Sequence, residues 1–172
     1  MSQFTTEIEW LRRKVESDPG SVLFARLADS YLELDEVQRA IEIAQSGLSA
    51  NPNYVTAKYV LAKCYYKRQE FDRAASVLKE ALSIDPQHLA SLSLQSELLR
   101  KIGHVDDARN NYQQILNVDP VDSLTLSRLK ELEENGHTDY SQSFEDDYTA
   151  DYAAPAEPSP WDEDTDLNEE PF

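Results

Sequence analysis

Side chains able to perform catalysis are few in this sequence, and they are scattered. Cys64 is the single cysteine, and a cysteine nucleophile needs a neighbouring base or cation to form its thiolate. His88, His104 and His137 are isolated, and no His-x3-His or Cys-x2-Cys spacing suggests a metal site. The chain has only four glycines and no glycine-rich loop to cradle a phosphate. We therefore expect a protein that is not an enzyme and that uses no metal or cofactor.

A second group of side chains could bind rather than react. Residues 62–74, AKCYYKRQEFDRA, contain two adjacent tyrosines and four basic side chains. Tyrosine offers a large contact area at low entropic cost, and lysine and arginine recognise acceptor groups. These residue types favour recognition of a protein or peptide, provided that one helix face gathers them.

Charge is unevenly distributed along the 172 residues. The formal net charge is −17, yet residues 1–136 hold all 16 basic side chains against 21 acidic ones, whereas residues 137–172 hold 12 acidic ones and no Lys or Arg. Such a chain would repel a polyanion, so nucleic acid is not an expected partner. A single cysteine suits a reducing compartment, and neither a signal-peptide core nor a membrane-spanning run is evident. We expect a cytoplasmic protein with no membrane partner.

An internal repeat supplies the elements that must position these side chains. The dipeptides Asp18-Pro19, Asn51-Pro52, Asp85-Pro86 and Asp119-Pro120 recur with proline spacings of 33, 34 and 34. Proline cannot extend a helix, and it biases the preceding residue away from helical angles. Each dipeptide therefore marks the end of one helical unit.

Aligned on these prolines, the units share columns of small and of apolar residues. The small columns are Ala28, Ala62 and Ser96, and Ala40, Ala74 and Ala108. The other apolar columns are Tyr31, Tyr65 and Leu99; Ala44, Leu78 and Tyr112; and Leu48, Leu82 and Leu116. Small residues let two helices approach closely, and the larger ones fill the space between them. Each unit is thus predicted to be a helix, a short turn and an antiparallel helix.

The pattern resembles the tetratricopeptide repeat (TPR), which has the signature W-x2-L-G-x2-Y…A-x3-F…P. Residues 21–54, 55–88 and 89–122 match it as three consecutive repeats. The resemblance implies an all-α fold, a right-handed α-solenoid of antiparallel helix pairs. The departures from the signature are Phe24, Lys58 and Leu92 where Trp is typical, Gln95 where Leu is usual, and Asp35 and Gln69 at the turn position that Gly103 fills in the third repeat.

The flanks of the repeats fit the modified ends that a stacked array needs. Residues 1–20 are predicted to form a capping helix like the second half of a repeat, with Phe4, Ile8, Leu11 and Val15 at helical spacing. Residues 123–136 are predicted to form a C-terminal capping helix, with Leu124, Leu126, Leu129 and Leu132 on a polar background.

Residues 137–172 differ in composition from the rest of the chain. The segment is acidic and proline-containing, and without a repeat of apolar residues it is predicted to be a disordered tail. Aromatic residues nevertheless recur at intervals of four, at Tyr140, Phe144, Tyr148 and Tyr152. Either the tail only confers solubility, or it binds a partner or its own protein, in cis or by self-association.

The resemblance also implies which side chains face the concave groove of the solenoid. In the first repeat they are Val22, Ala25, Asp29, Leu32 and Glu33, and in the second they include Thr56. The groove should be acidic near the first repeat, and basic and aromatic farther on. The predicted peptide-binding residues are Tyr59, Lys63, Tyr66, Lys67, Ser93, Glu97, Arg100 and Lys101.

The groove residues favour a particular kind of partner. An acidic peptide with an aromatic or other apolar anchor would suit them, unless Tyr59 and Tyr66 pack on neighbouring helices and the lysines merely solvate the surface. TPR adaptors of chaperones hold a C-terminal carboxylate with a clamp of Lys, Asn and Arg. Ala25 and Asp29 occupy its leading positions here, and Asp29 would repel a carboxylate, so such a clamp is not expected.

Two functions of different classes follow from these observations. The first is a non-catalytic interaction module, a scaffold or adaptor that binds a partner segment in its groove. The alternative is a structural subunit of a larger assembly that uses the convex face or the tail.

Overall fold

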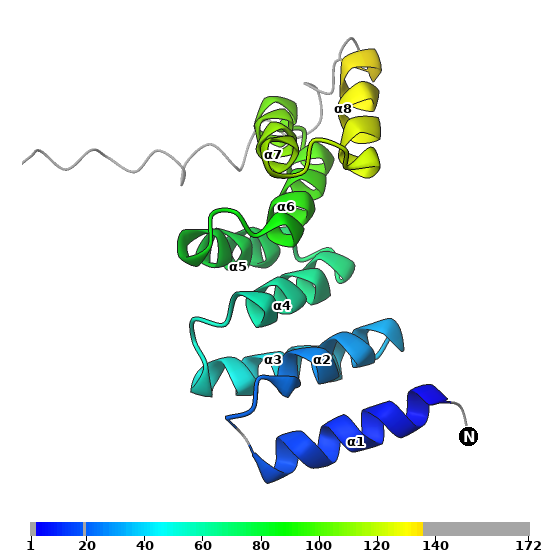
Figure 1. Cartoon of the computed structure of the whole chain (residues 1–172), viewed down its shortest axis with the longest axis vertical. Helices are drawn as coiled ribbons and strands as arrows, with labels where there is room; N and C mark the ends of the chain where they lie inside the picture. Colours follow the sequence, from blue (N-terminus) through cyan, green and yellow to red (C-terminus); the bar gives the residue numbers. More distant parts are fainter. Residues whose placement is uncertain (1–2, 19, 136–172) are drawn as a thin grey trace, which may run out of the picture. The chain divides into compact units, whose positions relative to one another are not determined.

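The computed structural model describes residues 3–18 and 20–135, which lie within one compact unit, residues 1–138. Eight α-helices and no strand occur in these ranges (Figure 1). The prediction of an all-α fold is therefore confirmed. In chain order the helices are α1 (Gln3–Ser17), α2 (Leu23–Glu33), α3 (Val37–Ala50), α4 (Val55–Lys67), α5 (Phe71–Ile84), α6 (Leu89–Lys101), α7 (Val105–Val118) and α8 (Ser123–Asn135).

Each helix packs against the next one in the chain, which gives the stacked pairs of a solenoid. The most extensive contacts join α2 to α3, α4 to α5 and α6 to α7. The first helices of successive pairs also touch, since α2 contacts α4 and α4 contacts α6. The face of α2, α4 and α6 that carries Asp29, Lys63 and Glu97 is called the first-helix surface below.

The small residues of the repeat columns lie where the paired helices meet. Ala28, Ala62 and Ser96 are fully buried, and so are their counterparts Ala40, Ala74 and Ala108. The Ser96 hydroxyl donates a 2.7 Å hydrogen bond to the Leu92 carbonyl, so a polar atom is tolerated at this position without an unpaired group.

The turn inside each helix pair requires a residue with positive φ. A residue with positive φ lies two positions after the last residue of α2, α4 and α6. These residues are Asp35 (φ 65°), Gln69 (φ 62°) and Gly103 (φ 88°). In each turn the next backbone N–H reaches back to a carbonyl five residues earlier, as in Glu70 to Tyr65 at 3.0 Å. This is the Schellman arrangement, in which glycine is favoured because it has no Cβ.

Replacing Gln69 with glycine is therefore expected to stabilise the protein by about 1 kcal/mol, because the left-handed conformation strains a residue that has a Cβ. The reciprocal change, Gly103→Ala, should destabilise it by a similar amount, since no atom lies within 4 Å of the added Cβ and backbone strain is the only cost. Urea unfolding of both variants measures the effects. Equal stabilities for Gln69→Gly and the parent would contradict this explanation.

The two ends of the described unit differ in how they are covered. Ile8 and Leu11 of α1 are buried against Leu27 of α2. In α8, Leu132 is buried, whereas the side chains of Leu124 and Leu126 are about half exposed, at 57% and 47%. The side chain of Phe4 and the acidic tail lie outside the part of the chain that the structure describes, so the expectations for them stay predictions.

Candidate functional site

Four of the eight predicted groove residues, Lys63, Tyr66, Lys67 and Lys101, line one hollow of the first-helix surface, and successive repeats pair their charges there. The Lys63 ammonium of α4 lies 2.6 Å from the Asp29 carboxylate of α2. Lys67 lies 2.7 Å from Asp35 and also donates to the Leu32 carbonyl at 3.2 Å. Basic residues of the second repeat are thus balanced by acidic residues of the first. The acidic side chains belong to the first repeat and the basic ones to the second, as expected, but the two groups are in direct contact.

The Asp29 carboxylate governs the protonation of Lys63. Partial burial acts to lower the pKa of the ammonium, but the hydrogen bond and the negative charge of Asp29 outweigh it, and the pKa is raised. Lys63 also lies above the ring of Tyr59, 5.7 Å from its centroid. The side chain is therefore held as a cation by groups of its own protein.

The two predicted groove tyrosines are half-buried and pack against neighbours. Tyr59 meets His88 edge-to-face at 5.9 Å, and Tyr66 is tilted against Phe71 at 5.8 Å. The alternative weighed from the sequence, that these rings pack on adjacent residues, thus describes part of their environment. The half-exposed ring of Tyr66 still lines a hollow of the surface.

This hollow, called the lysine pocket below, has a volume of about 470 Å³ and collects side chains from three successive repeats. Leu32 and Glu33 belong to α2, Lys63, Tyr66 and Lys67 to α4, Gln69 to the following turn and Lys101 to the end of α6. Its volume falls within the 300–1,000 Å³ of typical ligand sites. The Lys101 ammonium lies over the rings of Tyr66, at 5.1 Å, and Phe71, at 5.7 Å.

In the third repeat, Glu97 is the centre of an ion-pair network rather than an open contact residue. Its carboxylate accepts hydrogen bonds from Arg100 at 3.0 Å and from the Tyr112 hydroxyl at 3.1 Å. Arg128 of α8 lies 2.8 Å away through its Nε, although that contact lacks hydrogen-bond geometry. Glu97 and Arg100 thus bind each other and other side chains of the protein. Ser93, one turn earlier on α6, is half-buried.

Three predicted groove residues of the first repeat differ in their exposure. Ala25 and Leu32 are buried, at 2% and 5% exposed, because α4 packs against α2. Val22 is half exposed. Among these three, Leu32 also lines the lysine pocket, although little of its surface is exposed there.

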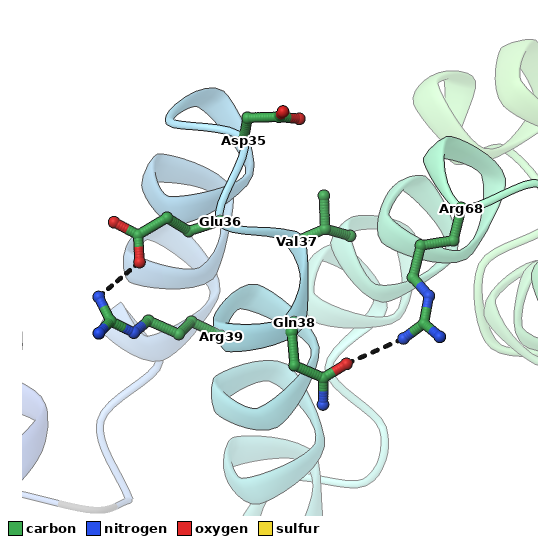
Figure 2. Close-up of a pocket in the computed structure, with 6 residues that line it drawn as sticks. All are labelled: Asp35, Glu36, Val37, Gln38, Arg39 and Arg68. Atoms are coloured by element: carbon green, nitrogen blue, oxygen red, sulfur yellow. Dashed lines mark hydrogen bonds and ion pairs between the residues drawn. The ribbon is translucent and has the colours of Figure 1, made fainter.

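A second hollow, of about 400 Å³, lies at the turn between α2 and α3 (Figure 2). Its charged side chains are already paired: Arg39 bonds Glu36, and Arg68 bonds Gln38 at 2.9 Å and Glu70 at 2.6 Å. Asp35, which also lines this hollow, is paired with Lys67. The lysine pocket is therefore the stronger candidate for a binding site.

Cys64 lies in the core, fully buried among residues of α2, α3 and α4. Burial raises the pKa of the thiol to about 11, against a smaller lowering by the positive charge of Lys63. The thiol is neutral near pH 8, which is the wrong state for a nucleophile.

Iodoacetamide at pH 8 is therefore expected to leave Cys64 of the folded protein largely unmodified and to alkylate it rapidly in urea. Because the folded pKa lies above the usual 8.5, stability contributed by the neutral thiol is present below that value and is lost as pH rises towards 11. Mass spectrometry of the treated protein measures the extent of alkylation. Thermal unfolding from pH 8 to pH 11, with Cys64→Ala as control, measures the loss of stability. Rapid labelling of the native protein would contradict the burial.

Two further kinds of functional feature do not occur among the described residues. No cluster of three or more His, Cys, Asp or Glu side chains that could hold a metal ion occurs there. No helix in the same ranges is long and apolar enough to cross a membrane.

Comparison with known proteins agrees with the stacked helix pairs. Two family models described as tetratricopeptide repeat match the chain, one over residues 25–88 and the other over residues 66–131. No curated protein sequence matches it.

Solved structures with the same fold include three of particular interest. MamA is 18% identical, covers 77% of this chain and 79% of its own, and has a TM-score of 0.67. TTC0263, a TPR protein from Thermus thermophilus, is 21% identical over 74% of this chain and 71% of its own, with a TM-score of 0.68. The first TPR of Spaghetti (RPAP3), solved with the HSP90 peptide SRMEEVD, is 15% identical over 70% of this chain and 95% of its own, with a TM-score of 0.65.

At these identities the structural matches show the fold, while the family models identify the repeats. TPR domains mediate protein–protein interaction, and the fold is typically a non-catalytic module. From its matched repeats and its stacked helix pairs, the chain belongs to the tetratricopeptide-repeat proteins.

Proposed function

We propose that this protein is a non-catalytic scaffold or adaptor that binds a segment of a partner protein on its first-helix surface, with the lysine pocket as the central contact. The observation that carries the proposal is the pocket itself, in which a partly exposed tyrosine and lysines from two repeats meet. Tyrosine and lysine there can contact an aromatic or aliphatic anchor and an acceptor group at the same time.

The partner segment should carry a carboxylate beside an apolar anchor. Lys101 is exposed, and its ammonium rests on two aromatic rings instead of on a carboxylate. A ligand carboxylate can therefore reach it without breaking an internal ion pair. A related TPR structure that contains the peptide SRMEEVD supports peptide binding by a domain of this fold.

We do not expect this chain to hold a C-terminal carboxylate with the clamp of chaperone adaptors. Asp29, at one of its leading positions, is paired with Lys63 of the next repeat. Both the aspartate and its lysine are therefore committed to each other. The proposed contact with a ligand carboxylate is at Lys101.

Site-specific photo-crosslinking in the source cell tests the proposal. p-Benzoylphenylalanine in place of Tyr66 should crosslink a partner protein, whereas the same group in place of Lys79, an exposed residue of α5, should not. Crosslinks from position 79, with none from position 66, would overturn the proposal and favour a structural subunit that uses the second helices of its repeats, α3, α5 and α7. A crosslink from position 66 to residues 137–172 would identify the acidic segment as the ligand, in cis or in a second copy.

A further inference from the structure

The lysine pocket contains more positive groups than it can offer to a ligand. Of its three lysines, Lys63 and Lys67 form short ion pairs, at 2.6 and 2.7 Å, with Asp29 and Asp35. A ligand carboxylate would have to share these ammonium groups with aspartates that the fold already holds beside them. The two central charges are therefore compensated before a ligand arrives.

Two charged side chains of the pocket are not compensated in this way. Lys101, at the end of α6, forms no ion pair with any described residue. Glu33, at the end of α2, is exposed and likewise has no ion pair within the described part of the chain. Since α4 contacts both α2 and α6, the open negative group comes from the helix on one side of α4 and the open positive group from the helix on the other.

We propose that the lysine pocket selects a dipolar partner segment, in which a basic side chain meets Glu33, an apolar side chain lies against Tyr66, and an acidic side chain meets Lys101. The inference rests on the proposed function, and it adds the order of charges along the ligand. The aspartates at positions 29 and 35 make the pocket selective, because they remove the excess positive charge that would otherwise attract any acidic segment.

The arrangement also fixes the direction in which the segment lies. Reversing a dipolar segment would bring its acidic side chain to Glu33 and its basic side chain to Lys101. Two attractions would become two repulsions. Each exposed charge contributes modestly, about 1 kcal/mol or less, so the preference for one direction depends on both ends acting together.

Fluorescein-labelled synthetic peptides provide the probes, with the full chain as the binding protein. Each peptide has a central Phe flanked two residues away on each side by Lys or Asp, in the orders Lys-Phe-Asp, Asp-Phe-Lys, Lys-Phe-Lys and Asp-Phe-Asp. Fluorescence anisotropy should show one of the two mixed peptides binding about fivefold more tightly than both uniform ones. Lys101→Glu and Glu33→Lys should each abolish that preference, and Lys79→Glu, an exposed change on α5, should not.

The double variant Glu33→Lys/Lys101→Glu is the decisive measurement. It exchanges the two open charges, so the preferred peptide should switch to the mixed one of opposite order. Tightest binding of Asp-Phe-Asp by the parent protein, or no switch in the double variant, would overturn the dipolar selection. If in addition position 66 yields no crosslink to a protein, the proposed function fails as well, whereas a crosslink there leaves it standing.

Discussion

Replacing Glu97 with alanine is expected to destabilise the protein by about 2–3 kcal/mol and to release α8 from its neighbours. The carboxylate joins Arg100 of its own helix, Tyr112 of α7 and Arg128 of α8. Its removal leaves Arg100 without its carboxylate partner, Arg128 with Glu131 alone, and the buried Tyr112 phenol without its acceptor. Breaking a fully buried ion pair costs about 3–5 kcal/mol, and solvent around these arginines reduces that figure.

Urea unfolding and amide hydrogen exchange measure the two consequences separately. Because contacts in a repeat array are made between neighbours, the faster exchange should be concentrated in α8 and the end of α6. Glu97→Gln, which keeps one acceptor oxygen, should lose about half as much stability. Glu133→Ala, an exposed change on α8, should lose less than about 0.5 kcal/mol. Unchanged protection of α8 in Glu97→Ala would show that the network does not hold this helix.

Gly47→Ala is expected to destabilise the protein by about 1–2 kcal/mol, although alanine is the better helix former. An added Cβ would lie 2.1 Å from ring atoms of Phe24, which is itself almost fully buried. Overpacking of this kind costs about 1–3 kcal/mol, and the gain in helix propensity returns at most about 1 kcal/mol. The close approach of ring and backbone therefore accounts for the glycine inside α3.

The repeats themselves supply the matched control. Where Phe24 is paired with Gly47, the second repeat has Lys58 with Ala81 and the third has Leu92 with Ile115. A smaller residue at the first position thus accompanies a larger one at the second. Phe24→Leu should accordingly rescue Gly47→Ala, so that the double variant is more stable than the sum of the two single changes predicts. Additive losses measured by thermal unfolding would exclude direct contact as the cause.

Sequence reasoning is most reliable where one physical cause repeats. Proline at the end of each unit, and small residues where helices meet, recur because every repeat solves the same packing problem. The all-α solenoid and its family were predicted on that basis and are confirmed. That the predicted groove residues bind a partner stays a prediction. Four of them are among the seven residues that line the lysine pocket.

The pairing of charges between repeats was harder to predict. Asp29 and Lys63 are 34 residues apart, and only the superposition of α4 on α2 brings them to 2.6 Å. Arg128 had no recognisable role in the sequence, because its partner Glu97 belongs to another helix. A signal existed in hindsight, since equivalent positions of successive repeats carry the alternating charges of Asp29, Lys63 and Glu97.

The helix pairs and their order could be predicted from the sequence alone, since they depend on local periodicity and on proline, glycine and small residues. Which charges of the first-helix surface form ion pairs with one another depends on the tertiary structure. The reason is that an ion pair depends on the distance between two side chains in space. Stacking pairs Lys63, Lys67 and Glu97 with other side chains of the protein, whereas Glu33 and Lys101 line the same pocket without an ion pair to a described residue.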